Sequence, residues 1–291
     1  MSTWAGAYTA IVTPFTRDGQ VDYERFKELI EFQIAGGVDG LVPVGTTGES
    51  PTLDYVEHER VIEVAIETAR KRVKIIAGTG ANSTAEALEL TRHAKDAGAD
   101  ATLQVTPYYN KPNALGLTRH FAAVADLGLP VVLYNVPGRT GKEIPLDVVV
   151  ELSKHPAVVA IKEAAGSVDR VSQIVTSCPK LEVLSGDDSL TLPMMSVGGV
   201  GVISVASNVA PRAVADLVHH ALAGRWAEAR ALHLKYYRLF ADLFIDTNPI
   251  PVKTALALMG KIEDVYRLPL CEMSEGLKKR LEATLRSVHL I

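Results

Sequence analysis

The chain has 291 residues, of which 47% are hydrophobic and 22% are charged, and its formal net charge is −4. This composition excludes an intrinsically disordered chain, because it supplies enough apolar side chains for a large core. The slightly acidic balance also argues against a nucleic-acid-binding protein or a protein that binds anionic membranes through a basic surface. The length exceeds that of most single domains but is common for an α/β barrel.

The two cysteines, Cys178 and Cys271, lie far apart and show no paired spacing. They are typical of a protein from a reducing compartment, where cysteines pack like other small side chains. The first fifteen residues contain neither a basic segment nor a long apolar segment, so they do not resemble a signal peptide. No apolar run is long enough to span a membrane. We therefore expect a soluble cytoplasmic protein.

Strand-like and helix-like patterns alternate along the chain. Short apolar runs predict strands at 8–15, 40–44, 74–78, 101–106, 130–136, 158–164, 181–184 and 201–205, although Pro43 weakens the second. Helical spacing of apolar residues predicts helices between them at 23–35, 54–70, 82–97, 115–126, 146–153, 168–176 and 190–197. Further helical segments follow the last strand, with breaks near 224, at 248–251 and at 268–269.

These units predict an α/β fold, a closed (β/α)8 TIM barrel with a C-terminal helical extension. The strands are nearly continuous apolar runs, as expected for a parallel sheet covered by helices, and about eight units suffice to close a barrel. An open doubly wound sheet is the alternative, but no GxGxxG motif follows the first strand. We assign residues 1–224 to the barrel, which would carry the active site, and residues 225–291 to the extension packed on it.

The strand at 158–164, with the sequence VVAIKEA, contains a single lysine, Lys162. Strict alternation would put Val158 and Ala160 on the same face as Lys162, and Val159, Ile161 and Glu163 on the other face. One interpretation is a lysine exposed to water at the end of a strand. The other is a nucleophile that forms a Schiff base, which needs a desolvated amine.

Polar residues gather where the predicted strands end, which is where barrel enzymes place their chemistry. They include Thr13, the turn 45–49, the segment 106–110, Tyr134, Arg139, Lys162 and the segment 185–188. No HExxH motif or Cys/His cluster predicts a metal site, and the pair Asp187-Asp188 is more typical of a helix cap than of a metal ligand. The turn 45–48 lacks the GK[ST] ending of a phosphate loop, and no GxSxG motif is present.

The remaining hydroxyl groups, one arginine and one lysine suit the chemistry of a class I aldolase. A lysine amine would condense with a ketone, and hydroxyl groups would carry the proton. Backbone N–H groups and the arginine would hold carboxylates. This chemistry needs no metal and no cofactor apart from the covalent imine itself.

Six segments together resemble the dihydrodipicolinate synthase (4-hydroxy-tetrahydrodipicolinate synthase) family. They are GTTGES, VTPYYNKP, YNVPGRTG, VVAIKEA, SGDDS and GVGVISVASN, which occur in this order and span most of the chain. The resemblance implies a (β/α)8 barrel with a C-terminal helical extension, usually assembled as a homotetramer of two tight dimers. It also implies condensation of pyruvate with L-aspartate 4-semialdehyde to give 4-hydroxy-tetrahydrodipicolinate, on the route to diaminopimelate and lysine.

The resemblance also implies roles for individual residues. Lys162 would form the imine with pyruvate, and Tyr134 would shuttle protons. Thr46 would link Tyr134 to Tyr109, which in this family reaches in from the neighbouring subunit. The pyruvate carboxylate would be held by Thr47, with help from the backbone of Gly186 and Ile203, and Arg139 would bind the semialdehyde carboxylate.

Two other functions remain open at the level of the sequence. N-acetylneuraminate lyases and 2-keto-3-deoxy sugar acid aldolases use the same lysine and tyrosine, although Arg139 favours an acceptor that carries a carboxylate. A barrel of this kind could also be a binding protein without catalysis. Retention of the lysine, the hydroxyl groups and the arginine disfavours that alternative.

In regulated members of the family, an L-lysine molecule binds at the tight-dimer interface as a feedback inhibitor. The matching positions here are Ser50, Pro51, Tyr55, His58, Asn82, Glu86 and Tyr108. Glu86 could pair with the ammonium group of the inhibitor. Tyr55 departs from the histidine of some regulated bacterial members, so the strength of inhibition stays open, and a plain polar dimer interface is the alternative.

Overall fold

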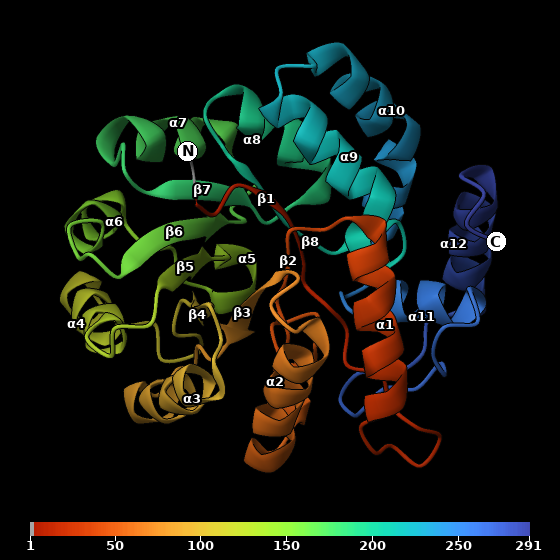
Figure 1. Cartoon of the computed structure of the whole chain (residues 1–291), viewed down its shortest axis with the longest axis horizontal. Coiled ribbons are helices and arrows are strands. Elements are labelled where there is room, and N and C mark those ends of the chain that lie inside the picture. Colours follow the sequence, from red (N-terminus) through yellow and green to blue (C-terminus); the bar gives the residue numbers. More distant parts are fainter. Residues whose placement is uncertain (1–2) are drawn as a thin grey trace.

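Eight parallel strands form a closed barrel in the computed structural model, which describes residues 3–291 (Figure 1). Each strand pairs with its neighbours in chain order, and β8 closes the barrel on β1. The strands are β1 (Gly6–Thr9), β2 (Gly40–Leu41), β3 (Lys74–Gly78), β4 (Ala101–Val105), β5 (Val131–Asn135), β6 (Val158–Glu163), β7 (Glu182–Ser185) and β8 (Gly201–Ser204). The predicted fold class is therefore confirmed.

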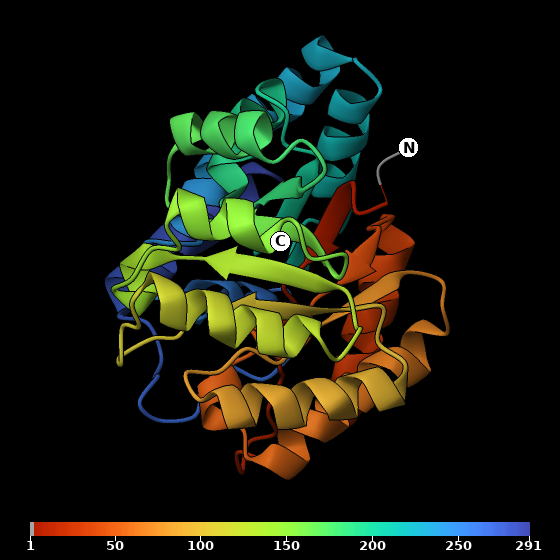
Figure 2. The ribbon, with the colours of Figure 1, turned by 90° about the vertical axis from the view of Figure 1, so that its left-hand side faces the viewer.

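A layer of helices covers the outside of the barrel (Figure 2). The helices between the strands and directly after β8 are α1 (Tyr23–Gly36), α2 (Tyr55–Ala69), α3 (Thr84–Ala97), α4 (Ala114–Ala125), α5 (Pro137–Thr140), α6 (Leu146–Leu152), α7 (Val168–Ser177), α8 (Thr191–Ser196) and α9 (Pro211–Leu222). Three short 3-10 turns lie at Ser50–Thr52, Asp188–Leu190 and Ala206–Asn208. None of the helices within 3–291 combines the length and hydrophobicity that a membrane crossing requires.

Local sequence signals explain where several helices begin and end. Asp54 and Glu57 form a reciprocal capping box at the start of α2, which satisfies backbone N–H groups that the helix itself cannot bond. At the end of α1, Gly37 adopts the left-handed conformation (φ 85°) that a side chain would disfavour. The second predicted strand is shorter than expected, because Pro43 cannot donate to the ladder and β2 ends at Leu41.

The alternation predicted for β6 holds only in its second half. The β5–β6 ladder shifts register between Val131 and Val132, so one extra residue is inserted in β6. As a result Val158 lies in the apolar layer under the helices, while Val159 packs against the cluster that contains Ala160. The prediction that Val158 shares a face with Lys162 is therefore wrong.

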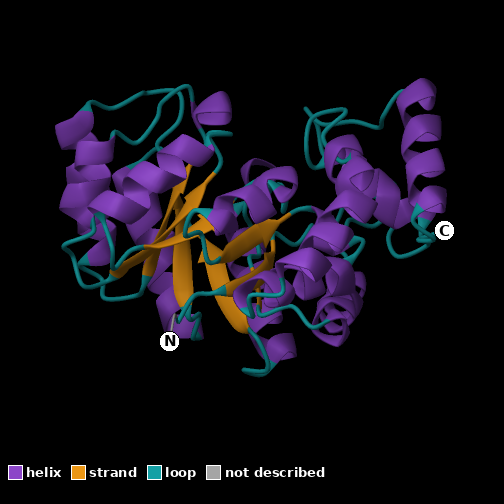
Figure 3. Ribbon diagram, turned by 90° about the horizontal axis from the view of Figure 1, so that it is seen from above, coloured by secondary structure: helices purple, strands orange, loops and turns teal. Residues whose placement is uncertain are grey.

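The C-terminal extension consists of α10 (Trp226–Asp242), α11 (Ile250–Leu258) and α12 (Glu275–Ser287). These helices lie at one side of the molecule (Figure 3). Their buried side chains, such as Leu239, Leu256 and Leu285, belong to the same apolar cluster as residues of α1 and α2. The extension and the barrel are thus held together by a shared core.

Two buried histidines predict that the protein loses stability in acid. Burial lowers the pKa of His58 in α2 and of His120 in α4 to about 4. Between pH 6.5 and 4 the unfolded chain binds these protons and the folded chain does not, so stability is complete above pH 6.5 and falls as the pH drops. At pH 4.5 the loss should be about 2.5 kcal/mol per histidine. Urea unfolding at pH 7 and at pH 4.5 gives the free energy of unfolding at each pH, and the difference between them is this loss.

A His120→Gln variant provides the control for this prediction, because glutamine does not titrate. Thr84 Oγ1 lies 2.9 Å from His120 Nδ1, and an amide can also bond to a hydroxyl group. We expect the variant to lose less stability between the two pH values than the wild type does. Equal losses in both proteins would contradict the assignment to His120.

Candidate active site

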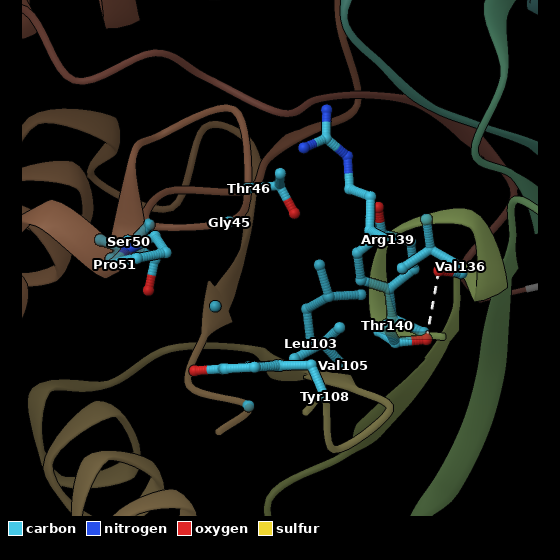
Figure 4. Close-up of a pocket in the computed structure, with 14 residues that line it drawn as sticks. Gly45, Thr46, Ser50, Pro51, Leu103, Val105, Tyr108, Val136, Arg139 and Thr140 are labelled. Atoms are coloured by element: carbon cyan, nitrogen blue, oxygen red, sulfur yellow. Dashed lines mark hydrogen bonds between the residues drawn. The ribbon is translucent and has the colours of Figure 1, made fainter. Parts of the chain in front are cut away.

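A cavity of about 230 Å³ opens at the C-terminal ends of the barrel strands. Its lining comes from the turn after β2, the ends of β3, β4 and β5, and the short helix α5. Thr46, Tyr134 and Arg139 all line it, and Figure 4 shows the side chains of Thr46 and Arg139 at its upper rim. Three of the residues expected at the site are therefore brought together.

Lys162 is buried beside this cavity, with 5% of its surface exposed. Tyr134 and Lys162 are opposite each other in the β5–β6 ladder, and the Lys162 Nζ lies 4.3 Å from the centre of the Tyr134 ring. Lys162 itself does not line the cavity. Tyr134 lines the cavity and also contacts Lys162, so its side chain links the lysine to the cavity. This burial rules out a lysine exposed to water, and the nucleophile interpretation stays a prediction.

A buried hydrogen-bond network on the outer face of β6 holds the end of the strand that carries Lys162. Glu163 is fully buried and accepts hydrogen bonds from Asn135 Nδ2 at 2.9 and 3.0 Å. Arg170 of α7 pairs with the same carboxylate at 3.3 Å. Burial raises the pKa of the Glu163 carboxyl, and the bonds from Asn135 and Arg170 oppose that rise. The network holds β5 against β6 where Tyr134 and Lys162 face each other.

The end of β7 contacts Lys162 from the other side. A Cβ atom added to Gly186 would lie 2.5 Å from the Ala164 Cβ and 3.2 Å from the Lys162 Cε, so only glycine allows this close approach. Burial raises the pKa of the Asp187 carboxyl, and the charge of Lys162 opposes this rise. Asp187, from the strand-end segment 185–188, therefore interacts electrostatically with Lys162.

The prediction that Asp187-Asp188 caps a helix is wrong. No side-chain cap bond forms at Asp187, and the buried Asp188 carboxylate accepts hydrogen bonds from the Ser204 hydroxyl and from the backbone N–H groups of Val205 and Ala206. It thereby ties the end of β7 to the end of β8, next to Ile203. Within residues 3–291 no cluster of three or more His, Cys, Asp or Glu side chains is suited to hold a metal ion.

The turn after β2 presents its two threonines differently. Thr46 lines the cavity, whereas Thr47 is 2% exposed and its Oγ1 accepts a hydrogen bond from Asn248 Nδ2 at 3.0 Å. Backbone bonds from Gly48 to Gly45 and from Glu49 to Thr46 close the turn. The conformation of this turn therefore determines where the hydroxyl groups of Thr46 and Thr47 lie.

Arg139 is the cation of the site. It lies on α5 and its Nη2 donates to the main-chain carbonyl of Asn248 at 2.9 Å. In the part of the chain that the structure describes, no carboxylate pairs with its guanidinium, which remains available for an anionic ligand. Asn248 comes from the C-terminal extension, and the only sequence signal near it is the break at 248–251.

Tyr109 is not part of the cavity of its own chain. Its side chain is 91% exposed, and its backbone has the left-handed φ of 68°. The preceding residue, Tyr108, lines the cavity instead (Figure 4). A role for Tyr109 in catalysis would require a second subunit.

The residues expected to bind L-lysine lie in different surroundings. Ser50, Pro51 and Tyr108 line the same cavity as the candidate catalytic residues (Figure 4). Partial desolvation first, and the negative charge of Glu86 second, raise the pKa values of Tyr55 and Tyr108. The remaining two positions are His58, which is 5% exposed, and Asn82, whose carbonyl accepts a hydrogen bond from Asn110.

Comparisons with known proteins cover almost the whole chain. Residues 3–288 match the model of the Dihydrodipicolinate synthetase family. The 4-hydroxy-tetrahydrodipicolinate synthase of Geobacter sulfurreducens is 56% identical over 288 residues, which is 98% of this chain and 99% of the relative.

Two solved structures have nearly the same fold as this chain. A dihydrodipicolinate synthase from Acinetobacter baumannii, complexed with pyruvate, is 46% identical with a TM-score of 0.98, and the match covers 99% of this chain and 100% of the other. The enzyme from Cyanidioschyzon merolae with lysine bound is 38% identical with a TM-score of 0.96, and the match covers both chains completely. The barrel, the buried lysine beside a tyrosine and these similarities agree, and the chain belongs to the dihydrodipicolinate synthetase family.

Proposed function

We propose that this protein condenses pyruvate with L-aspartate 4-semialdehyde through an imine on Lys162, giving 4-hydroxy-tetrahydrodipicolinate. The observation that carries the proposal is the buried Lys162 amine, 4.3 Å from the ring centre of Tyr134. This is a lyase activity on the route to diaminopimelate and lysine. Two relatives that are 56% and 53% identical over 98% of this chain bear the name 4-hydroxy-tetrahydrodipicolinate synthase, which supports the proposal. The chemistry uses the covalent imine and no other cofactor.

The first half of the reaction activates pyruvate. The neutral amine of Lys162 attacks C2 of pyruvate, and the carbinolamine loses water as the imine forms. Tyr134 delivers the proton to the departing hydroxyl group, since it lies beside Lys162 and lines the cavity. The Thr47 hydroxyl and the backbone at Gly186 and Ile203 hold the pyruvate carboxylate. The Tyr134 phenolate left by this proton delivery then takes a proton from C3, which gives the enamine and restores the phenol.

The second half joins the two substrates. The enamine carbon attacks the aldehyde carbon, and the shuttle formed by Tyr134, Thr46 and Tyr109 of the partner subunit protonates the resulting alkoxide. The α-amino group of the semialdehyde then attacks the imine carbon. This attack closes the ring, and departure of the Lys162 amine then releases the product and regenerates the enzyme. Arg139 holds the semialdehyde carboxylate during these steps.

Borohydride trapping tests the imine directly. The protein is treated with pyruvate and borohydride, the intact mass is measured, and the modified peptide is mapped. We expect one reduced pyruvyl adduct, located on Lys162. No adduct, or an adduct on another lysine, would refute the proposal.

Arg139→Ala should raise the KM for the semialdehyde by about 10- to 100-fold, because a charge-assisted pair with a carboxylate is lost. The KM for pyruvate should change little. Steady-state kinetics with each substrate varied in turn provide the measurement. Arg139→Lys is the matched control and should give an intermediate value, since it keeps the charge without the planar fork. Equal changes in both KM values would contradict this role.

A homotetramer built from two tight dimers fits the surface near the cavity. Large apolar side chains are exposed on α2, on α4 and in the segment before α4, at Tyr55, Val56, Tyr108, Tyr109 and Leu115, and Tyr108 also lines the cavity. A second copy would cover them and bring Tyr109 toward the neighbouring site. We also place the protein in the cytoplasm, where its free cysteines, Cys178 and Cys271, would stay reduced.

L-Lysine is proposed as a feedback inhibitor at this dimer interface, with Glu86 pairing with its ammonium group. The lysine-bound relative from Cyanidioschyzon merolae supports the proposal. Millimolar lysine should lower the steady-state rate, and Glu86→Gln should weaken that inhibition while leaving the uninhibited rate near wild type. A wild-type rate that does not respond to lysine would rule out the proposal.

A further inference from the structure

The start of α11 lies against the turn after β2, although the two segments are about 200 residues apart. Asn248 Nδ2 donates to Thr47 Oγ1 at 3.0 Å, and five residues later Lys253 Nζ donates to the Glu49 carboxylate. Lys253 and Glu49 are both almost completely buried. The ion pair therefore anchors the segment that carries Asn248 against the segment that carries Thr47.

The bond between Asn248 and Thr47 defines the direction of a hydroxyl group. The Thr47 Oγ1 accepts the amide N–H, so its own proton points elsewhere. No acceptor for that proton is found among residues 3–291. A buried hydroxyl proton without an acceptor is costly, and a carboxylate oxygen would satisfy it with a charge-assisted bond.

The main chain of Asn248 makes a second contact with the site. Its carbonyl oxygen accepts from Arg139 Nη2 at 2.9 Å, which fixes one side of the guanidinium and leaves the other side free. Asn248 therefore touches both the hydroxyl group assigned to pyruvate and the cation assigned to the semialdehyde. Its side chain serves the first contact, and its backbone serves the second.

A purely structural role explains this arrangement poorly. Asn248 is 5% exposed, and its Oδ1 is buried without a hydrogen-bond partner among the described residues. Burying an unpartnered amide oxygen costs stability, whereas an apolar side chain of similar size would carry no such cost. The presence of an amide at this position is therefore explained by the hydrogen bond that its N–H donates to the Thr47 hydroxyl oxygen.

We infer that Asn248 is a positioning residue that sets the Thr47 hydroxyl as a donor toward the pyruvate carboxylate and, through its carbonyl, orients Arg139 for the second substrate. The inference rests on the proposed function. The side-chain amide of Asn248 acts on Thr47, and its main-chain carbonyl acts on Arg139. A substitution of the side chain should therefore change pyruvate binding alone. It also gives the C-terminal extension a direct part in the active site.

A double-mutant cycle between Asn248 and Thr47 tests the inference. Borohydride trapping at a series of pyruvate concentrations, without semialdehyde, gives the half-saturating pyruvate concentration for each variant. Asn248→Ala should raise that concentration about tenfold in the wild-type background and have almost no effect in a Thr47→Val background, since the hydroxyl group is then absent. The semialdehyde KM of Asn248→Ala should stay within about twofold of wild type, because the carbonyl remains.

Asn248→Asp is the second variant, because aspartate has almost the same shape but cannot donate. It would accept the Thr47 proton and turn the hydroxyl group away from pyruvate, so its effect should exceed that of Asn248→Ala. Melting temperatures of all variants establish that they are folded, and the nearly isosteric Asp variant carries the test if the Ala variant is not.

The possible failures are distinguishable. If the wild type forms no adduct, the proposed imine function fails and the inference falls with it. If the wild type forms the adduct and Asn248→Ala forms it at the same pyruvate concentration, the inference alone is overturned. Equal effects of Asn248→Ala with and without the Thr47 hydroxyl would also overturn it, because Asn248 would then act independently of Thr47.

Discussion

Replacing Lys162 with alanine is expected to lower kcat by at least about 10³-fold and to abolish the borohydride-trapped pyruvyl adduct. In the proposed mechanism this amine supplies the covalent bond to pyruvate. No lysine lines the cavity itself, and Lys162 is the lysine whose Nζ lies over the Tyr134 ring among the described residues. The substitution removes a side chain that is 95% buried, so the cavity it leaves can also lower the melting temperature. Single-turnover trapping and steady-state kinetics on the same preparation measure both effects.

Two variants separate the loss of the amine from general damage. Lys162→Arg keeps a cation beside the Tyr134 ring but cannot form the imine, so it should be as inactive as Lys162→Ala. Lys279→Ala removes an exposed lysine of α12 and should leave activity and adduct formation unchanged. A folded Lys162→Ala protein with more than about one hundredth of wild-type turnover would contradict the imine mechanism.

The second large effect is expected at the ion pair between Lys253 and Glu49. Lys253 lies 4.1 Å from the Phe15 ring centre, and burial lowers the pKa of its amine while the Glu49 carboxylate opposes that change. Lys253→Met leaves Glu49 buried without its cation, so the free energy of unfolding should fall by about 3–5 kcal/mol. Urea unfolding followed by circular dichroism gives this value.

The double variant Glu49→Leu/Lys253→Met shows whether the pair itself stabilises the fold. Replacing a buried ion pair by apolar side chains is often close to neutral, because the desolvation penalty of both charges disappears. We therefore expect the double variant to be more stable than Lys253→Met alone. Arg17→Met, which breaks the exposed pair with Glu263, is the control and should have little effect. Additive losses at Lys253 and Glu49 would show that the two side chains act separately.

The double variant also connects stability with function. Glu49 is two residues from Thr47, and Lys253 is five residues from Asn248. If the ion pair holds these segments together, the double variant should fold well and still bind pyruvate more weakly than the wild type. The buried pair would then be retained for the geometry of the site rather than for stability alone.

The barrel, and the strand end that carries the candidate nucleophile Lys162, could both be predicted from the sequence. Both depend on local patterns: apolar strands alternate with amphipathic helices, and polar residues such as Tyr134 and Lys162 occur where strands end. Because parallel barrel strands all end on the same side, residues that are distant in the chain could be assigned to one cavity without knowing any tertiary contact.

Which side chains hold these residues in place could be seen only in the folded structure. The bulge beside Val131 moved Val158 to the outer face of β6, and the Asp188 carboxylate was found to join β7 to β8. The contacts of Asn248 with Thr47 and Arg139 span 201 and 109 residues of chain. Periodicity and turn chemistry act over a few residues, so they carry no information about pairs that only the closed barrel and the packed C-terminal helices bring together.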